Sequence, residues 1–169
     1  MWNDTDTPLA YLITFRCYGT WLHGDERGSV DRRSNQYGTP RIPSSPRWNA
    51  ASSASLKHPP VNLDAAMRSS VEKAIKETCS IRGWPLYAMN VRTNHAHSVV
   101  AAGGVDPSKI LLALKANATR KLREDGVLAN DHSPLSDRGS KRYLWNDSSV
   151  TSAIDYVLYG QGDDLPDFV

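Results

Sequence analysis

The stretch RTNHAHSVVAAGG, residues 92–104, sets two histidines at the head of an apolar run that ends in two glycines. The apolar residues that follow His97 predict a β-strand, and the glycines predict its end. Because side chains of a strand alternate between its faces, His95 and His97 are expected to point the same way, and Ala96 the other way. Two imidazoles on one face are able to hold a divalent metal ion. Mg²⁺ or Mn²⁺ suits such a pair when phosphate and water complete the shell.

The length and composition predict one soluble domain spanning residues 1–169, with a net charge of +2. Cys17 and Cys79 lie in apolar patterns and have no metal-binding spacing, which is typical of buried thiols in a reducing compartment. The sequence has neither an apolar run long enough to cross a membrane nor a leader pattern at its start. We therefore expect a cytoplasmic protein without a membrane partner.

A long basic insertion is predicted at about residues 23–62, after a first strand at 11–21. It is rich in Ser, Pro, Arg and Gly, and we expect it to be partly mobile. Residues 32–60 contain no acidic residue, which suits a polyanion such as DNA, although a solvated loop explains the pattern equally well. The candidate DNA contacts in this segment are Arg32, Arg33, Arg41 and Arg47.

The remaining patterns predict helices at 64–83 and 106–126, and a last helix at 147–162 that is capped by Asp147 or a neighbouring serine. Strands are predicted at 84–92, 95–102 and 141–146, and the two central ones are expected to form an antiparallel hairpin. In the first of these, Leu86, Ala88 and Asn90 are expected to share one face, opposite Tyr87, Met89 and Val91. This order predicts an α+β fold of the ferredoxin-like type, a central antiparallel sheet with helices on one face.

The helix at 106–126 has an apolar stripe and a basic side. Its cations are free to face solvent or phosphate, and many surface helices are equally basic. The candidate DNA contacts on it are Lys115, Arg120, Lys121 and Arg123.

The motif NHAH, together with a tyrosine about sixty residues later in AIDYVLYGQ, resembles the single-tyrosine transposases of the HUH class, most closely those associated with REP elements. The opening TFRCYGTWLHGDERGS, residues 14–29, is similar to a bacterial subset of these proteins. The resemblance implies an enzyme that cleaves and rejoins single-stranded DNA next to hairpins, works as a homodimer, and uses a metal bound by His95 and His97. A tyrosine then forms a 5′-phosphotyrosine link and leaves a free 3′-hydroxyl.

Tyr156 is the first candidate nucleophile, because it precedes an aliphatic residue as in the family, and Tyr159 is the alternative. The family's third metal ligand is a glutamine four residues after the tyrosine. Here Gly160 takes that position and Gln161 follows it. At 100° per residue, this extra step turns Gln161 off the Tyr156 face unless the helix loosens at Gly160.

Two other functions stay open. One is a catalytically inactive protein that binds hairpin DNA and derives from such a transposase. The other is an unrelated phosphoesterase, either metal-dependent or of the two-histidine kind. The two-histidine kind would need a second HxT or HxS element, which the chain lacks. Weaker candidates are His23 and Asp25 near the metal, and Tyr18 and Trp21 as rings that stack on bases.

Overall fold

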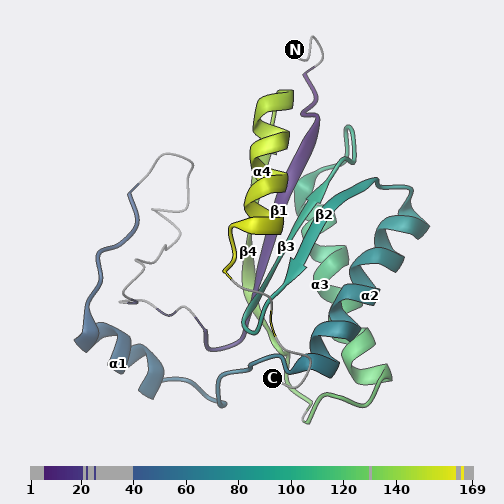
Figure 1. Cartoon of the computed structure of the whole chain (residues 1–169). Coiled ribbons are helices and arrows are strands. Elements are labelled where there is room, and N and C mark those ends of the chain that lie inside the picture. The colour runs from purple at the N-terminus through teal and green to yellow at the C-terminus, as the bar shows by residue number, and fades with distance from the viewer. Residues whose placement is uncertain are drawn as a thin grey trace.

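β1 (Ala10–Cys17) lies inside a sheet and pairs with a strand on each side (Figure 1). The computed structural model describes residues 6–20, 22, 25, 40–129, 131–162 and 165. Within them the strand order is β2-β3-β1-β4, and every pairing is antiparallel. β2 (Leu86–Val91) and β3 (His95–Val100) form the expected hairpin. The predicted α+β fold with a central antiparallel sheet is therefore confirmed.

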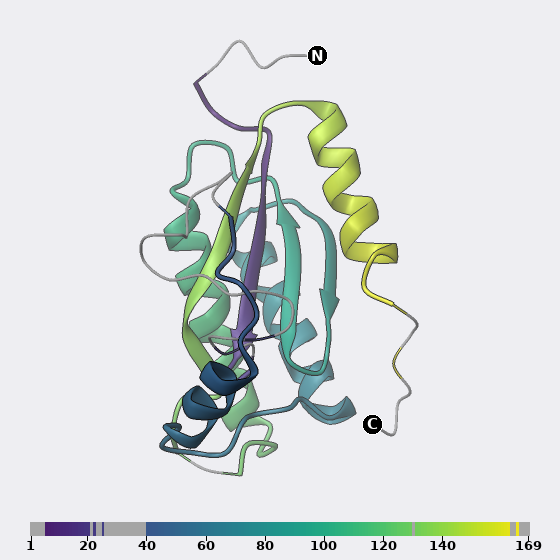
Figure 2. The same ribbon diagram turned by 90° about the vertical axis from the view of Figure 1, so that its left-hand side faces the viewer.

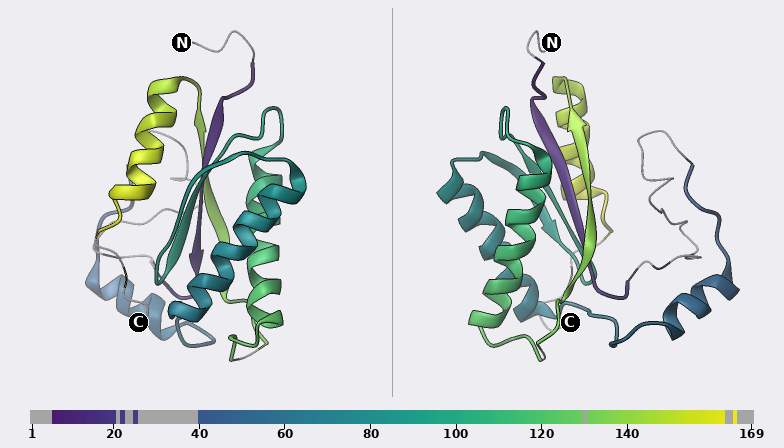
Figure 3. Two further views of the ribbon diagram at one scale, coloured as in Figure 1. Left: turned by 45° about the vertical axis from the view of Figure 1, so that its right-hand side comes forward. Right: turned by 180° about the vertical axis from the view of Figure 1, so that it is seen from behind.

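Two helices, α2 (Ala65–Arg82) and α3 (Pro107–Glu124), lie side by side on one face of the sheet (Figure 3). α2 begins at Asp64, whose carboxylate accepts the Met67 N–H at 2.9 Å, and ends at Gly83, which is left-handed with φ 68°. Both helices turn an apolar stripe inward. Their buried residues form the larger core with the odd-numbered residues of β1, namely Tyr11, Ile13, Phe15 and Cys17.

α4 (Asp147–Tyr159) covers the opposite face, so the expectation of helices on one face only is wrong in this detail (Figures 2 and 3). The reason is that β1 and β3 are apolar on both faces. A second, smaller core joins Ala153 and Val157 of α4 to Leu12, Val99 and other sheet residues. The cap of the helix is Asn146, whose side chain accepts the Ser149 N–H at 2.9 Å, and not the predicted Asp147 or a serine.

β4 (Leu135–Leu144) is longer than the strand predicted at 141–146, and it lies at an edge of the sheet. Only its first and last residues are buried. The residues between them are mostly polar and show no apolar alternation. This segment therefore forms a strand because it pairs with β1, and not because of a pattern in its own sequence. Gly139 is required where it lies, because a Cβ there would come within 2.6 Å of the Thr14 carbonyl oxygen.

A register shift between Leu86 and Ala88 changes the face assignment at the start of β2. Leu86 packs with Met89 and Val91 toward α2 and α3, whereas Ala88 packs toward α4. The prediction that Leu86 and Ala88 share a face is wrong, since an extra residue in a strand resets its alternation.

A helix that the sequence pattern did not predict, α1 (Pro46–Ala54), lies within the basic insertion. It begins at Ser45, whose hydroxyl accepts the Trp48 N–H at 3.2 Å, and Pro46 occupies its first turn. None of its residues is buried, and it stands away from the sheet on the α4 side (Figures 1 and 2). The first strand also ends earlier than predicted, at Cys17. In the part of the chain described, no helix has the length and apolar character needed to cross a membrane.

Candidate active site

His95 and His97 lie on the α4 face of β3, as the alternation predicts. Val99, which shares this face, packs toward α4, whereas Ala96 and Val100 pack toward α2 and α3. Their ring centroids are 4.7 Å apart and the ring planes are 73° apart. His97 is 6% exposed, and His95 is half-buried. The sheet therefore brings the two imidazoles together at the edge of the smaller core.

The Nδ1 atom of each histidine lies beside a side-chain oxygen. The Nδ1 of His97 lies 2.7 Å from the hydroxyl of Thr14, its register partner on β1. The Nδ1 of His95 lies 2.6 Å from the side-chain oxygen of Asn94. An amide oxygen only accepts, so His95 Nδ1 carries the proton and donates it. Contacts of this kind fix ring orientation and leave Nε2 as the ligand atom.

Gln161 approaches the pair from the end of α4. Its Oε1 lies 3.1 Å from His95 Nε2, while its Nε2 donates to the Tyr156 carbonyl at 3.1 Å. That second hydrogen bond fixes which end of the amide faces the histidine. Gln161 Oε1 thus lies at hydrogen-bond distance from His95 Nε2 and accepts from it when that nitrogen carries a proton.

Burial lowers the pKa of His97 to about 4, and the neighbouring charges of His95 and Arg16 also lower it. A hydrogen bond with Gln161 raises the pKa but does not offset these effects. The ring is therefore neutral at pH 7. A neutral imidazole has a lone pair to offer to a metal ion.

Tyr156 lies against the histidines, with its ring 5.4 Å from the His97 ring and the planes 65° apart. It is 48% exposed, so one side of the phenol meets the histidines and another is accessible. Tyr159, one turn further on, is 78% exposed. Of the two candidate tyrosines, Tyr156 is the one that contacts the histidine pair.

Gly160 explains how Gln161 reaches the histidines despite the extra residue after Tyr156. α4 ends at Tyr159, and Gly160 caps it, so the step of 100° per residue does not extend to Gln161. A Cβ at Gly160 would lie 2.8 Å from the Tyr156 carbonyl oxygen and 3.1 Å from its ring carbon Cδ2. A glutamine at position 160 would therefore displace the tyrosine.

These donors fit a divalent metal ion. Two imidazoles and one amide oxygen converge, and imidazole nitrogens and neutral oxygens are ligands that divalent metals accept. Among the residues described, no cluster of three or more His, Cys, Asp and Glu residues could hold a metal. A site here would thus consist of two histidines and a neutral oxygen, which leaves coordination positions for phosphate and water.

The predicted DNA contacts lie in three places. Arg32 and Arg33 fall outside the described residues, and Arg41 and Arg47 are exposed in the segment that contains α1. The other four are on α3, across the sheet from the histidines. Lys115, Arg120 and Arg123 line a groove of about 510 Å³ there. Lys121 lies near Glu77 at 3.9 Å and Asp125 at 3.8 Å.

The weaker candidates are found in different places. His23 and Trp21 lie outside the described residues, and the Asp25 N–H donates to the Leu22 carbonyl at 3.1 Å. Tyr18 contacts two loop histidines, His58 at 6.1 Å and His132 at 5.8 Å between ring centroids.

Sequence reasoning included Asn94, which lies beside His95 Nδ1, as part of the NHAH motif, but it missed two other polar residues that support the site. Thr14 lies beside His97 Nδ1, and the Asn90 side chain donates to the Val157 carbonyl at 2.9 Å, which ties the last turn of α4 to β2. Thr14 and Asn90 are isolated polar residues within apolar strands, and this is the signal that could have identified them.

Comparison with known proteins gives one family match and a similar solved structure. That structure is described as a REP-associated tyrosine transposase bound to a REP hairpin; the likeness covers 93% of this chain and 67% of that one, with 13% identity and a TM-score of 0.49. No curated protein matches the chain. The family model described as "Transposase IS200 like" matches residues 58–156, more than half of the chain, from the loop before α2 to Tyr156 itself. The chain belongs to the IS200-like transposase family.

Proposed function

We propose that this transposase cleaves and rejoins single-stranded DNA near hairpins, with Tyr156 as nucleophile and His95, His97 and Gln161 as ligands of Mg²⁺ or Mn²⁺. The observation that carries the proposal is the contact of the Tyr156 ring with His97, beside the converging nitrogen and oxygen donors. A metal ion bound there supplies Lewis-acid stabilisation of charge on the phosphate.

The chemistry assigned to the chain's own residues is a balanced exchange of ester bonds. The Tyr156 phenol oxygen attacks the phosphorus atom and loses its proton, the bond from phosphorus to the 3′-oxygen breaks, and that oxygen leaves as a 3′-hydroxyl. The product is a 5′-phosphotyrosine ester. Because one phosphate ester replaces another, the reverse attack by a 3′-hydroxyl rejoins the strands without ATP.

The phenol needs help because its ordinary pKa is near 10. Thr14 and Asn94 hold the imidazoles that would bind the metal, and Asn90 holds the last turn of the helix that carries Tyr156. These contacts position the nucleophile before DNA arrives, which lowers the entropic cost of the attack.

The cations on α3 and in the insertion stay proposed DNA contacts, and a homodimer stays a proposal. The α3 groove faces away from the histidines. DNA that contacts it would therefore be a part of the substrate other than the cleaved phosphate, such as a hairpin stem.

The test is formation of a covalent adduct. The purified protein with Mg²⁺ or Mn²⁺ and a labelled single strand bearing a hairpin should yield a protein–DNA band on a denaturing gel. Tyr156→Phe should abolish this band, and the matched control Tyr159→Phe should retain it.

The outcomes separate the alternatives. An adduct formed by Tyr156→Phe would overturn the assignment of the nucleophile. If the wild-type protein binds the hairpin but forms no adduct with either metal, the chain is a DNA-binding protein without catalysis.

A further inference from the structure

We propose that Tyr143 and Trp145, at the end of β4, form a platform on which unpaired bases of the hairpin loop stack. The two rings are stacked, with their planes 11° apart and their centroids 5.9 Å apart. Tyr143 is 47% exposed and Trp145 is 42% exposed. This inference deepens the proposed function and rests on it, because it takes hairpin DNA as the substrate.

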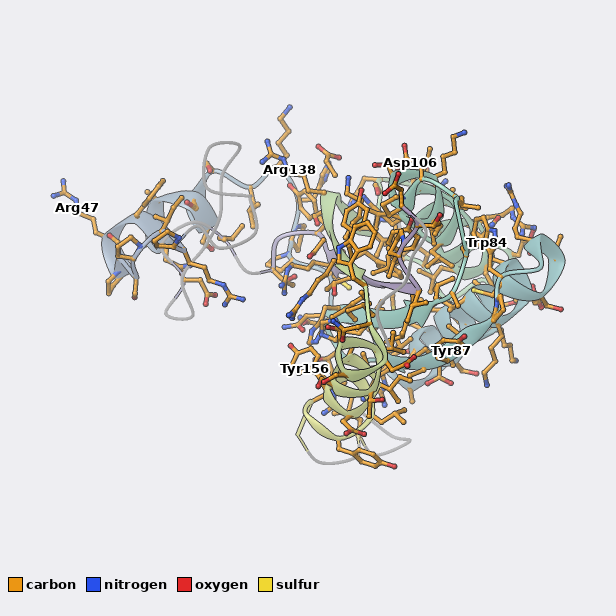
Figure 4. The ribbon with its side chains drawn as sticks, turned by 90° about the horizontal axis from the view of Figure 1, so that it is seen from above. Arg47, Trp84, Tyr87, Asp106, Arg138 and Tyr156 are labelled. Carbon is orange, nitrogen blue, oxygen red and sulfur yellow. The ribbon has the colours of Figure 1, made fainter. Side chains whose placement is uncertain are left out.

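The platform lies on the face of the sheet opposite the histidines. Tyr143 is the partner of Tyr11, which packs in the larger core with α2 and α3. The two tyrosine rings meet edge to face, with centroids 5.3 Å apart, and this contact orients the ring on which Trp145 stacks. Seen from above, Asp106 at the start of α3 and Tyr156 lie on opposite sides of the sheet (Figure 4). The platform is on the Asp106 side.

The α3 groove and the platform lie toward opposite ends of the same strand. Leu135, which lines the groove, pairs with Cys17, and Tyr143 pairs with Tyr11. His95 also lies at the Cys17 end of β1. From residue 17 to residue 11 the strand rises about 20 Å, at about 3.4 Å per residue. A stem of about six base pairs spans that length, at about 3.4 Å per pair. A stem in the groove with its foot toward the histidine end would thus place its loop at the platform.

Cations lie between the groove and the platform. The Lys141 amine donates to the Ser108 hydroxyl at 2.8 Å, which places it between β4 and the first turn of α3. Lys115, further along α3, donates to a carbonyl of β4 at 2.6 Å. The nearby carboxylate of Asp106 accepts the Ser108 N–H at 2.8 Å and caps the helix. Exposed aromatic rings next to cations suit bases and phosphates of an unpaired strand, which favours DNA over an apolar protein partner.

The experiment compares two labelled hairpins with the same stem, in EDTA so that nothing is cleaved. One has a loop of thymines, and the other has a loop of abasic residues of equal length. The wild-type protein should bind the thymine loop about 5-fold to 150-fold more tightly, which is the range for stacking of one base on an aromatic ring. W145A should decrease this ratio of affinities, and Y143A/W145A should bring it close to unity.

The matched control is Y87A. Tyr87 is 51% exposed and lies on β2, the other edge strand of the described sheet. Its removal should leave the ratio at the wild-type value. Because the ratio compares two DNAs on one protein, a general loss of stability does not change it, and urea unfolding confirms that each variant is folded.

A wild-type ratio near unity would overturn the inference, and so would a ratio that Y143A/W145A retains or that Y87A loses. If Y143A/W145A retains the ratio but loses self-association in size-exclusion chromatography, the rings are a contact between copies of the chain. Covalent adducts of the wild-type protein are assayed separately. Normal adducts with a ratio near unity refute the platform alone, whereas a loop preference without adducts refutes the proposed catalysis alone. Failure to bind either hairpin refutes both.

Discussion

Thr14 lies opposite His97 on the neighbouring strand, and its hydroxyl is 2.7 Å from Nδ1 of that ring. It is 5% exposed, so water does not replace the contact when the hydroxyl is removed. The contact holds the His97 ring in its orientation. In the proposed metal site, the ring offers Nε2.

Thr14→Val should lower the free energy of unfolding by about 1–3 kcal/mol, because a buried ring nitrogen loses its partner. It should also weaken Mn²⁺ binding by about 10–100-fold, since the imidazole is no longer oriented. Urea unfolding and calorimetric titration with Mn²⁺ measure the two effects.

Thr78→Val is the control, because Thr78 is equally buried and its hydroxyl donates to the Ala74 carbonyl within α2, away from the site. It should cost stability and leave Mn²⁺ affinity unchanged. Equal Mn²⁺ affinity in Thr14→Val and the wild-type protein would refute the role of Thr14.

α4 depends on few contacts for an element that carries the proposed nucleophile, Tyr156. Only Ala153 and Val157 are buried, and the ends of the helix are held by Asn146 at the start and by Asn90 and Gln161 at the last turn. Elements with little buried surface open at low free energy. α4 is therefore expected to open before the sheet does.

Asn146→Ala should cost about 1 kcal/mol, because the first turn of α4 loses its cap. Amide hydrogen exchange should become faster in α4 than in β1 or α2, and adduct formation should slow. Asp64→Ala removes the matching cap of α2 and serves as the control. If both variants accelerate exchange uniformly over the whole chain, α4 does not open on its own.

The whole chain brings the histidines and Tyr156 together without a second copy, since its own Tyr156 ring contacts its own His97 ring. We therefore expect an active site assembled in cis. A mixture of His97→Ala and Tyr156→Phe should form no adduct, because neither chain contains a complete site. Recovery of the adduct on mixing would show that the tyrosine acts on a partner's histidines. As a control, wild-type protein is mixed with each variant alone, which shows whether exchange of subunits by itself inhibits adduct formation.

Both cysteines are buried in the larger core, where burial raises the pKa of Cys17 to about 12 and that of Cys79 to about 11. In the unfolded chain the thiols ionise near pH 9. The stability that they contribute is thus fully present below about pH 9 and is lost as the pH rises through 11 and 12.

Urea unfolding measured between pH 8 and pH 11 should show this decrease, and C17A/C79A should have a flatter profile over the same range. Subtracting one pH profile from the other separates the effect of the thiols from that of lysines and tyrosines, which ionise in the same pH range. Parallel profiles would refute the contribution of the thiols.

Much of the fold was predictable because local patterns agree with it. The caps Asp64 and Gly83 bound α2, and the two neighbouring strands form the expected hairpin. The start of α4 and the extent of β4 were not predictable in the same way. Asn146 competes with Asp147 and nearby serines as a cap, and the middle of β4 is polar at an edge.

The sequence by itself determined the chemistry available to this protein, since the spacing of His95 and His97 places both rings on one face of any strand that contains them. Only the tertiary structure decided which residues meet them. The packing of α4 on the face opposite α2 and α3 brings Tyr156 and Gln161 to the histidines, and the end of the helix at Tyr159 frees Gln161 from helical geometry. The physical reason is that periodicity acts within one element, whereas contacts across 66 residues depend on which faces are buried together.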